Sequence, residues 1–191
     1  RRPLVASASA ILGSVMPAWD VKFAHHFPNA SELASEANYH SWFLRLCGIL
    51  GNPGKAEELI AEAKQAGVRL KGNVFGYKQA FKNSPTTHDL RLLHDLLTLT
   101  WGEFPSITDP TAGGGSIPFE TTRYGLDASA NDLNPIAASL LRTGVRIPAV
   151  YGSGLLKEID ELGSMISSRI ETALADAFAR EDPHEDIVGY L

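Results

Sequence analysis

The sequence has 191 residues, of which 44% are hydrophobic and 20% are charged, and its formal net charge is −5. This length and balance are typical of a soluble globular protein with one core. The acidic balance gives no support to an autonomous nucleic-acid-binding domain, because phosphate neutralisation needs clustered Lys and Arg. The single cysteine, Cys47, excludes an internal disulfide and a cysteine-based zinc site within these residues.

No apolar run approaches the roughly 18 residues that span a bilayer, and no signal peptide precedes the fold, so we expect a cytoplasmic protein without a membrane partner. His25 and His26 have no acidic or cysteine partner at ligand spacing, so no metal site is expected.

A helical region is predicted over residues 1–103. Apolar side chains recur at helical spacing in four segments of this region, and each segment begins with a helix start signal. The predicted helices cover residues 3–16, 31–50 and 53–66, and a fourth carries the leucines between Leu90 and Leu99. Their start signals are Pro3 in a first turn, Ser31 as a cap, the pair Asn52 and Pro53, and Thr86 or Thr87 as a cap.

The connector over residues 68–85 interleaves basic and aromatic side chains. The members of this pattern are Lys71, Tyr77, Lys78, Phe81 and Lys82. Such a pattern is typical of a strip that binds nucleic acid through phosphates and stacked bases. Core aromatic side chains beside surface lysines would explain it as well. Both interpretations stay open from the sequence.

The centre of the chain has the pattern of a β-α-β unit with a glycine turn. A short strand ends at Asp109, the turn follows at 113–115, and a helix comes next. A second strand at about 128–131 is small and apolar, as a centre strand covered on both faces can be, and it ends at Asp132. The glycines let the backbone pass close to a ligand and aim free N–H groups at it. We predict the ligand-binding segment of an open α/β sheet over residues 104–150.

The acidic residues around the turn narrow the choice of ligand. Asp132 lies at the spacing of a carboxylate that accepts the hydroxyls of a ribose, which predicts a nucleoside-bearing cofactor. A dinucleotide fingerprint has a third glycine where this chain has Pro118, and a P-loop needs a lysine where Ser116 and Ile117 stand. S-adenosylmethionine suits the charges best, because Asp109 would repel phosphates and attract a sulfonium. We therefore expect Asp109 near the methionine end and Asp132 on the ribose.

Residues 151–191 are expected to form a long helix and an acidic linker. From Leu155 onward, apolar residues fall on one stripe and charged residues lie off it. The stripe suits an interaction helix or a helix that packs on the α/β body. Packing is the favoured interpretation, because a helix that covers a sheet needs one apolar face.

Residues 109–116, with the sequence Asp-Pro-Thr-Ala-Gly-Gly-Gly-Ser, carry a resemblance to a known family. They resemble motif I of the amino-methylating DNA methyltransferases, whose usual form is Asp-Pro-Phe/Thr-x-Gly-x-Gly-Ser/Thr. A wider set of residues is similar to the adenine-specific DNA methylase family that carries a zinc-ribbon insertion. This set comprises residues 1–4, the run 112–120, Arg123, Gly125, residues 132–135 and residues 188–191. The resemblance touches both ends and the centre, whereas residues 20–80 match only loosely.

The resemblance implies part of a Rossmann-like class I methyltransferase fold with a helical N-terminal layer. It implies S-adenosylmethionine as the cofactor, DNA as a partner through the parent protein, and adenine N6 as the target amine. The residues expected to bind the cofactor are Asp109, Pro110, Thr111, Ala112, Gly113, Gly115, Asp132 and Leu133, the last of these against the adenine. Thr86 and Thr87 are further cofactor candidates by analogy, or plain helix caps.

The catalytic motif of these enzymes, Asp/Asn-Pro-Pro-Tyr/Phe, is missing from the chain. Asn134-Pro135 continues with isoleucine and alanine, and Asn83-Ser84-Pro85 has no second proline. We therefore expect the N-terminal, cofactor-binding portion of a larger enzyme, with no catalytic residue of its own. The alternatives are a methyltransferase for RNA, protein or a small molecule, and a non-catalytic scaffold module with protein partners in a DNA modification or defence complex.

Overall fold

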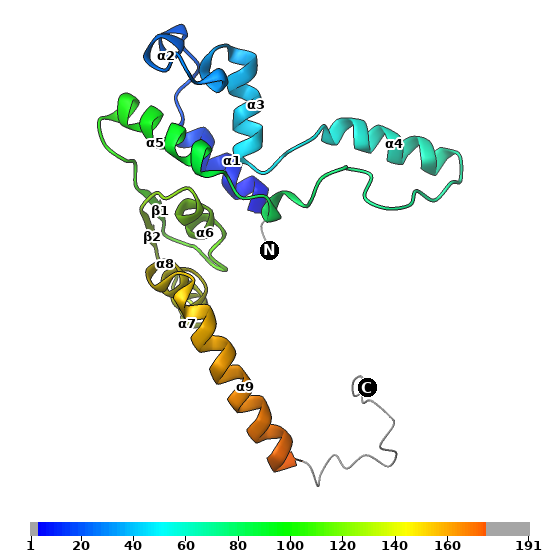
Figure 1. Ribbon diagram of the computed structural model, residues 1–191, viewed down its shortest axis with the longest axis vertical. Helices are drawn as coiled ribbons and strands as arrows, with labels where there is room; N and C mark the ends of the chain where they lie inside the picture. Colours follow the sequence, from blue (N-terminus) through cyan, green and yellow to red (C-terminus); the bar gives the residue numbers. More distant parts are fainter. Residues whose placement is uncertain (1–3, 175–191) are drawn as a thin grey trace. The chain divides into compact units, whose positions relative to one another are not determined.

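The computed structural model describes residues 4–174 (Figure 1). The chain divides into two compact units, one that ends at Arg146 and one that begins at Ile147, and each is described by itself. The described residues are mostly helical, with two short parallel strands. They have a mixed α/β character to this extent, and the larger Rossmann-like sheet stays a prediction. Among residues 4–174, none of the helices has the length and apolar character that crossing a bilayer requires.

Helices from the N-terminal half of the chain enclose the core of the first unit. They are α1 (Leu4–Val15), α2 (Val21–His26), the 3-10 turn η1 (Ser31–Leu33), α3 (Glu36–Leu46) and α5 (Thr87–Trp101). Leu12 of α1, Trp42 of α3 and Leu93 of α5 are completely buried in one apolar cluster. Each such side chain contributes about 1.5–3 kcal/mol when it is removed from water. The predicted helix over residues 3–16 is thus confirmed, with its apolar stripe facing the core.

The second predicted helix is divided in the structure. Ser31 opens the turn η1, and the cap of α3 is Ser35, whose hydroxyl accepts a first-turn backbone N–H at 3.2 Å. The prediction of Ser31 as the cap is therefore wrong. A salt bridge of 2.9 Å from Arg45 to Glu32 holds η1 beside α3. The helix also ends earlier than predicted, because the chain turns at Gly48 with a φ of +82°.

Helix α5 begins at a capping box. The hydroxyl of Thr86 accepts the Asp89 N–H at 3.1 Å, and the Asp89 carboxylate accepts the Thr86 N–H at 3.1 Å. The same buried carboxylate accepts the Trp42 indole N–H at 3.0 Å and an Arg45 N–H at 2.7 Å. Burial by itself would raise the pKa of Asp89, but the hydrogen bonds from Thr86 and Arg45 lower it. Of the two candidate threonines, Thr86 is the cap, and an ion pair joins α3 to α5.

Helix α4 (Pro53–Gln65) and the connector behind it leave the helical core and return to it (Figure 1). We call residues 49–82 the arm. Asn52 caps α4 as predicted, by accepting a backbone N–H at 3.2 Å. The connector ends in a 3-10 turn, η2 (Ala80–Lys82). Its return is fixed where the Asn83 side chain donates to the carbonyl of Gly48 at 2.8 Å.

The predicted β-α-β unit is present in the first unit. Its elements are β1 (Ile107–Asp109), α6 (Ser116–Arg123) and β2 (Ala128–Ala130). The strands are parallel, with Asp109 opposite Ala130. The prediction that the second strand is covered on both faces is wrong, because all three residues of β2 are exposed. Within the described residues the sheet has only two strands, so β2 is an edge strand.

Helix α7 (Pro135–Leu141), capped by Asn134 as predicted, and a π-helical turn, η3 (Arg142–Arg146), end the first unit. The second unit contains α8 (Ile147–Tyr151) and α9 (Gly154–Leu174). Helix α9 carries exposed apolar side chains that include Ile159, Leu162 and Ile166. Packing of α9 on the α/β body stays a prediction. The family blocks at residues 1–3 and 188–191 and the acidic linker lie outside the described residues.

Candidate cofactor-binding site

The candidate site lies at the carboxyl ends of the two parallel strands. Strand β1 ends at Asp109, which is buried, and its carboxylate accepts the Thr111 N–H at 3.2 Å. The chain beyond β2 lies against this turn, since Ala112 donates to the Asn131 carbonyl and Asn131 donates to the Asp109 carbonyl, each at 3.0 Å. Ligands of open α/β sheets bind at this edge, outside the carboxyl ends of the strands.

Asp132 joins the two loops of the site. One carboxylate oxygen accepts the Gly113 N–H at 2.8 Å, and the other accepts the Asn134 N–H at 2.8 Å. These hydrogen bonds, the one from Asn134 foremost, lower the pKa of Asp132. An ionised carboxylate has about four acceptor positions, so about two remain for a ligand. Asp132 is therefore a charged and positioned acceptor beside the glycine turn.

The glycine turn requires glycine at two positions. Gly113 and Gly115 have φ values of +53° and +79°, in the left-handed region that side chains disfavour. An added Cβ at Gly115 would lie 2.9 Å from the Leu141 side chain, whereas one at Gly113 or Gly114 would meet nothing within 4 Å. The backbone at 113 and 114 is thus open to close approach by a ligand, and Gly115 allows the turn to lie against the end of α7.

The amides of the turn are used differently from the prediction. Gly113 donates to Asp132, and Gly115 donates to the Ala112 carbonyl at 2.8 Å. The N–H groups of these two residues are therefore not free to point at a ligand, because the tight turn and the Asp132 carboxylate already accept them. The turn therefore gives a ligand room for close approach, but the N–H groups of Gly113 and Gly115 are not available to it.

The structure brings most of the predicted cofactor residues together. Those joined by direct hydrogen bonds in and around the turn are Asp109, Thr111, Ala112, Gly113, Gly115 and Asp132. Pro110 is exposed beside them, and Leu133 is fully exposed at 100%. Thr86, a candidate by analogy, uses its hydroxyl to accept from the Asp89 N–H and to donate to the Asp89 carboxylate at 2.7 Å.

Two further contacts support the site beside those predicted from the sequence. The hydroxyl of Ser7 in α1 donates to that of Ser116 at 3.1 Å, at the first residue of α6. Inside α6, Arg123 donates to both carboxylate oxygens of the buried Glu120, at 2.8 and 3.0 Å. Burial raises the pKa of Glu120 in spite of Arg123. Ser7 and Ser116 are 109 positions apart, so spacing could not reveal their contact, whereas Glu120 and Arg123 have the i, i+3 spacing of a helical ion pair.

Comparisons with known proteins add no relative to this picture. No family model, no curated protein and no solved structure matches the chain. The functional interpretation therefore depends on the residues of the site and on the resemblance of motif I.

Proposed function

We propose that this chain is the cofactor-binding part of an S-adenosylmethionine-dependent methyltransferase that acts on an exocyclic amine of DNA, adenine N6. The observation that carries the proposal is the pair of carboxylates at the ends of two adjacent parallel strands. Asp109 and Asp132 flank one glycine turn, and Asp132 accepts a hydrogen bond from that turn. The substrate class is taken from the resemblance of residues 109–116 to motif I.

The residues of the turn suit the chemical groups of this cofactor. Asp132 retains acceptor positions for two ribose hydroxyls, and the backbone at Gly113 and Gly114 has room for a ligand. The two carboxylates favour a cationic sulfonium over a pyrophosphate, which they would repel. When bound, S-adenosylmethionine supplies the methyl group for direct in-line transfer to an amine. The chain's own residues would bind and orient it.

The proposal assigns the catalytic step to residues other than those of this chain. An Asp/Asn-Pro-Pro-aromatic motif would accept hydrogen bonds from the target amine and stack on an extruded base. The 191 residues contain no such motif. We therefore expect this chain alone to bind the cofactor and to transfer no methyl group.

Calorimetric titration with S-adenosylhomocysteine tests the proposal, with NAD and ATP as comparison ligands. We expect binding of S-adenosylhomocysteine alone. Asp132→Asn should weaken that binding, because the amide loses the charge and one acceptor oxygen. Asp127→Asn is the matched control, since Asp127 is an exposed aspartate at the opposite end of β2.

Two results would refute the proposal for this chain. One is a folded chain that binds no S-adenosylhomocysteine, which would favour a scaffold module. The other is equal affinity for the Asp132→Asn and Asp127→Asn proteins, which would place the cofactor elsewhere. Circular dichroism of each protein shows whether the fold is retained.

A further inference from the structure

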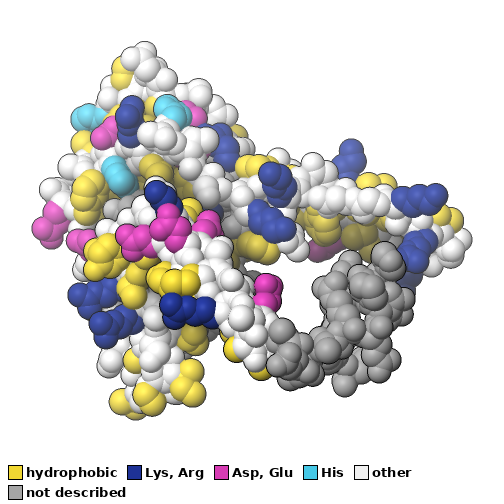
Figure 2. Space-filling view, turned by 60° about the horizontal axis from the view of Figure 1, so that its bottom comes forward, with side chains coloured by type: hydrophobic (Ala, Val, Ile, Leu, Met, Phe, Trp, Pro, Cys, Tyr) yellow, Lys and Arg dark blue, Asp and Glu magenta, His cyan; other side chains and the backbone are white. Residues whose placement is uncertain are grey.

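The arm contains a basic stretch in a chain that is acidic overall. From residue 63 to residue 88 the sequence has no Asp or Glu. The basic residues of this stretch are Lys64, Arg69, Lys71, Lys78 and Lys82. The acidic residues of the arm, Glu57, Glu58 and Glu62, all belong to α4. Figure 2 shows Lys and Arg side chains next to hydrophobic ones along the arm, at the right of the view. Clustered cations without acidic neighbours suit a polyanion.

Two aromatic side chains of this stretch face solvent. Phe75 is 41% exposed and Phe81 is 47% exposed, so neither is a core residue. Tyr77 meets Phe75 edge-on with ring centroids 6.4 Å apart, and the Lys82 ammonium lies 5.8 Å from the centroid of Phe81. The interpretation of Phe81 as a core aromatic is therefore wrong. Exposed rings beside cations are the parts of a surface on which bases stack.

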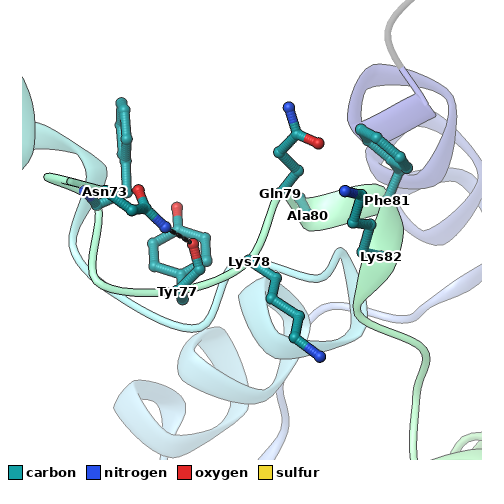
Figure 3. Close-up of a pocket in the computed structure, with 8 residues that line it drawn as sticks. Asn73, Tyr77, Lys78, Gln79, Ala80, Phe81 and Lys82 are labelled. Atoms are coloured by element: carbon teal, nitrogen blue, oxygen red, sulfur yellow. Dashed lines mark hydrogen bonds between the residues drawn. The ribbon is translucent and has the colours of Figure 1, made fainter. Parts of the chain in front are cut away.

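These side chains line an open pocket. Its wall is formed by Asn73, Phe75 and residues 77–82, and its volume is about 900 Å³. Figure 3 shows Tyr77 and Phe81 on opposite sides, with the amide of Gln79 between them and Lys82 beside Phe81. The pocket thus combines π surfaces, a neutral hydrogen-bonding group and cations within one short segment. We call residues 73–82 the strip.

Hydrogen bonds and glycines hold the strip in place. The Asn83 side chain donates to the carbonyls of Gly48 at 2.8 Å and of Lys78 at 3.1 Å. Gly48 and Gly51 allow close approach, since a Cβ at Gly48 would overlap the backbone of Ala80 and one at Gly51 would lie 2.8 Å from the Tyr77 ring. The side chains of the strip are thus presented from a backbone that is anchored at its base.

We propose that the strip binds single-stranded nucleic acid, with bases stacked on Phe75 and Phe81 and phosphates at Lys78 and Lys82. Stacking needs unpaired bases, which a duplex does not offer. An acidic peptide would use the cations and leave the exposed rings without a role. This binding depends on the arm and not on the glycine turn. A chain that binds oligonucleotides but not S-adenosylhomocysteine would therefore support the proposal for the strip and refute the proposed methyltransferase function.

Fluorescence anisotropy of the 191-residue chain tests the proposal. The probes are labelled oligothymidylate and oligouridylate of about 15 nucleotides, close to the largest site of a single stacking groove, and a DNA duplex of the same length. We expect both single strands to bind more tightly than the duplex. Phe75→Leu and Phe81→Leu should each weaken binding about fivefold or more, because leucine keeps the apolar bulk and loses the π face.

Two control variants separate the strip from the rest of the surface. Phe104→Leu removes a ring that is 50% exposed but lies outside the arm, and it should leave the affinity unchanged. Lys78→Gln with Lys82→Gln should make the slope of log affinity against log salt shallower by about 1.4, at about 0.7 per phosphate contact. Lys22→Gln, on the surface of α2, should leave that slope unchanged.

Three results would overturn the proposal. They are a folded chain that binds neither single strand, a duplex that binds as tightly as the single strands, and phenylalanine variants of the strip that behave like Phe104→Leu. Equal affinity for the deoxy and ribo strands would support recognition of their shared bases and phosphates. A preference for one of them would keep the proposal and identify the nucleic acid.

Discussion

Asp89→Asn is expected to destabilise the first unit by about 2–4 kcal/mol. Removing one partner of a buried ion pair costs about 3–5 kcal/mol. The cost is lower here because Arg45 is 41% exposed and keeps Glu32 as a second partner. Asn is nearly isosteric with Asp, so no cavity forms. However, its NH₂ group must face either the Thr86 N–H or the donors of Trp42 and Arg45, so one side of the network loses its acceptor.

Urea unfolding monitored by tryptophan fluorescence measures this loss. Asp95→Asn is the matched control, an exposed aspartate on the same helix, and it should change the free energy of unfolding by less than about 0.5 kcal/mol.

The pH dependence of this stabilisation has a defined sign. Because the pKa of Asp89 is lower in the folded state, its ionised form stabilises the fold above the unfolded pKa. The difference between wild type and Asp89→Asn should be complete at neutral pH and shrink below about pH 4. Equal free energies of unfolding for Asp89→Asn and Asp95→Asn at neutral pH would refute this account.

Three further outcomes follow from the same core. Gly48→Ala should lower the free energy of unfolding by more than the roughly 1–2 kcal/mol that a left-handed residue costs, because its Cβ would overlap the Ala80 backbone. Gly67→Ala, with φ +65° and open space around the Cβ, should lower it by only that amount. Urea unfolding measures both. Burial raises the pKa of Tyr39 to about 12, so stability should fall as the pH rises from about 10 toward 12, and Tyr39→Phe should reduce that fall. Cys47 is buried and its pKa is raised, so Ellman's reagent should label it slowly in the native protein and rapidly in urea.

Local signals in the sequence predicted many element boundaries. Asn52 and Asn134 cap their helices as expected, because an Asn side chain before a proline satisfies a free backbone N–H. The glycine turn and the end of β1 also lie where their spacing indicated, whereas β2 ends at Ala130, two residues before the predicted Asp132. These features depend on a few neighbouring residues, so the sequence carries enough information to locate them.

Features that depend on distant residues were not predictable in the same way. Ser31 and Ser35 are both reasonable caps, and the choice between them involves the contact of Glu32 with Arg45. The burial of β2 depends on which other strands and helices lie beside it, and the residues of β2 alone do not indicate this. At the candidate site, the spacing indicated the two carboxylates. It could not reveal that Asp132 already holds the Gly113 N–H.

The base of the arm has a consequence for how this chain can vary. Gly48 and Asn83 flank the arm and are joined by a hydrogen bond, so its two ends meet at one point of the core. A segment with adjoining ends can be gained, shortened or exchanged in one step, because the order and spacing of the surrounding helices are unchanged. Joining residue 48 to residue 83 through a short linker would yield a minimal core. Under the proposed role of the strip, exchanging the arm alone would change nucleic-acid binding while the glycine turn stays the same.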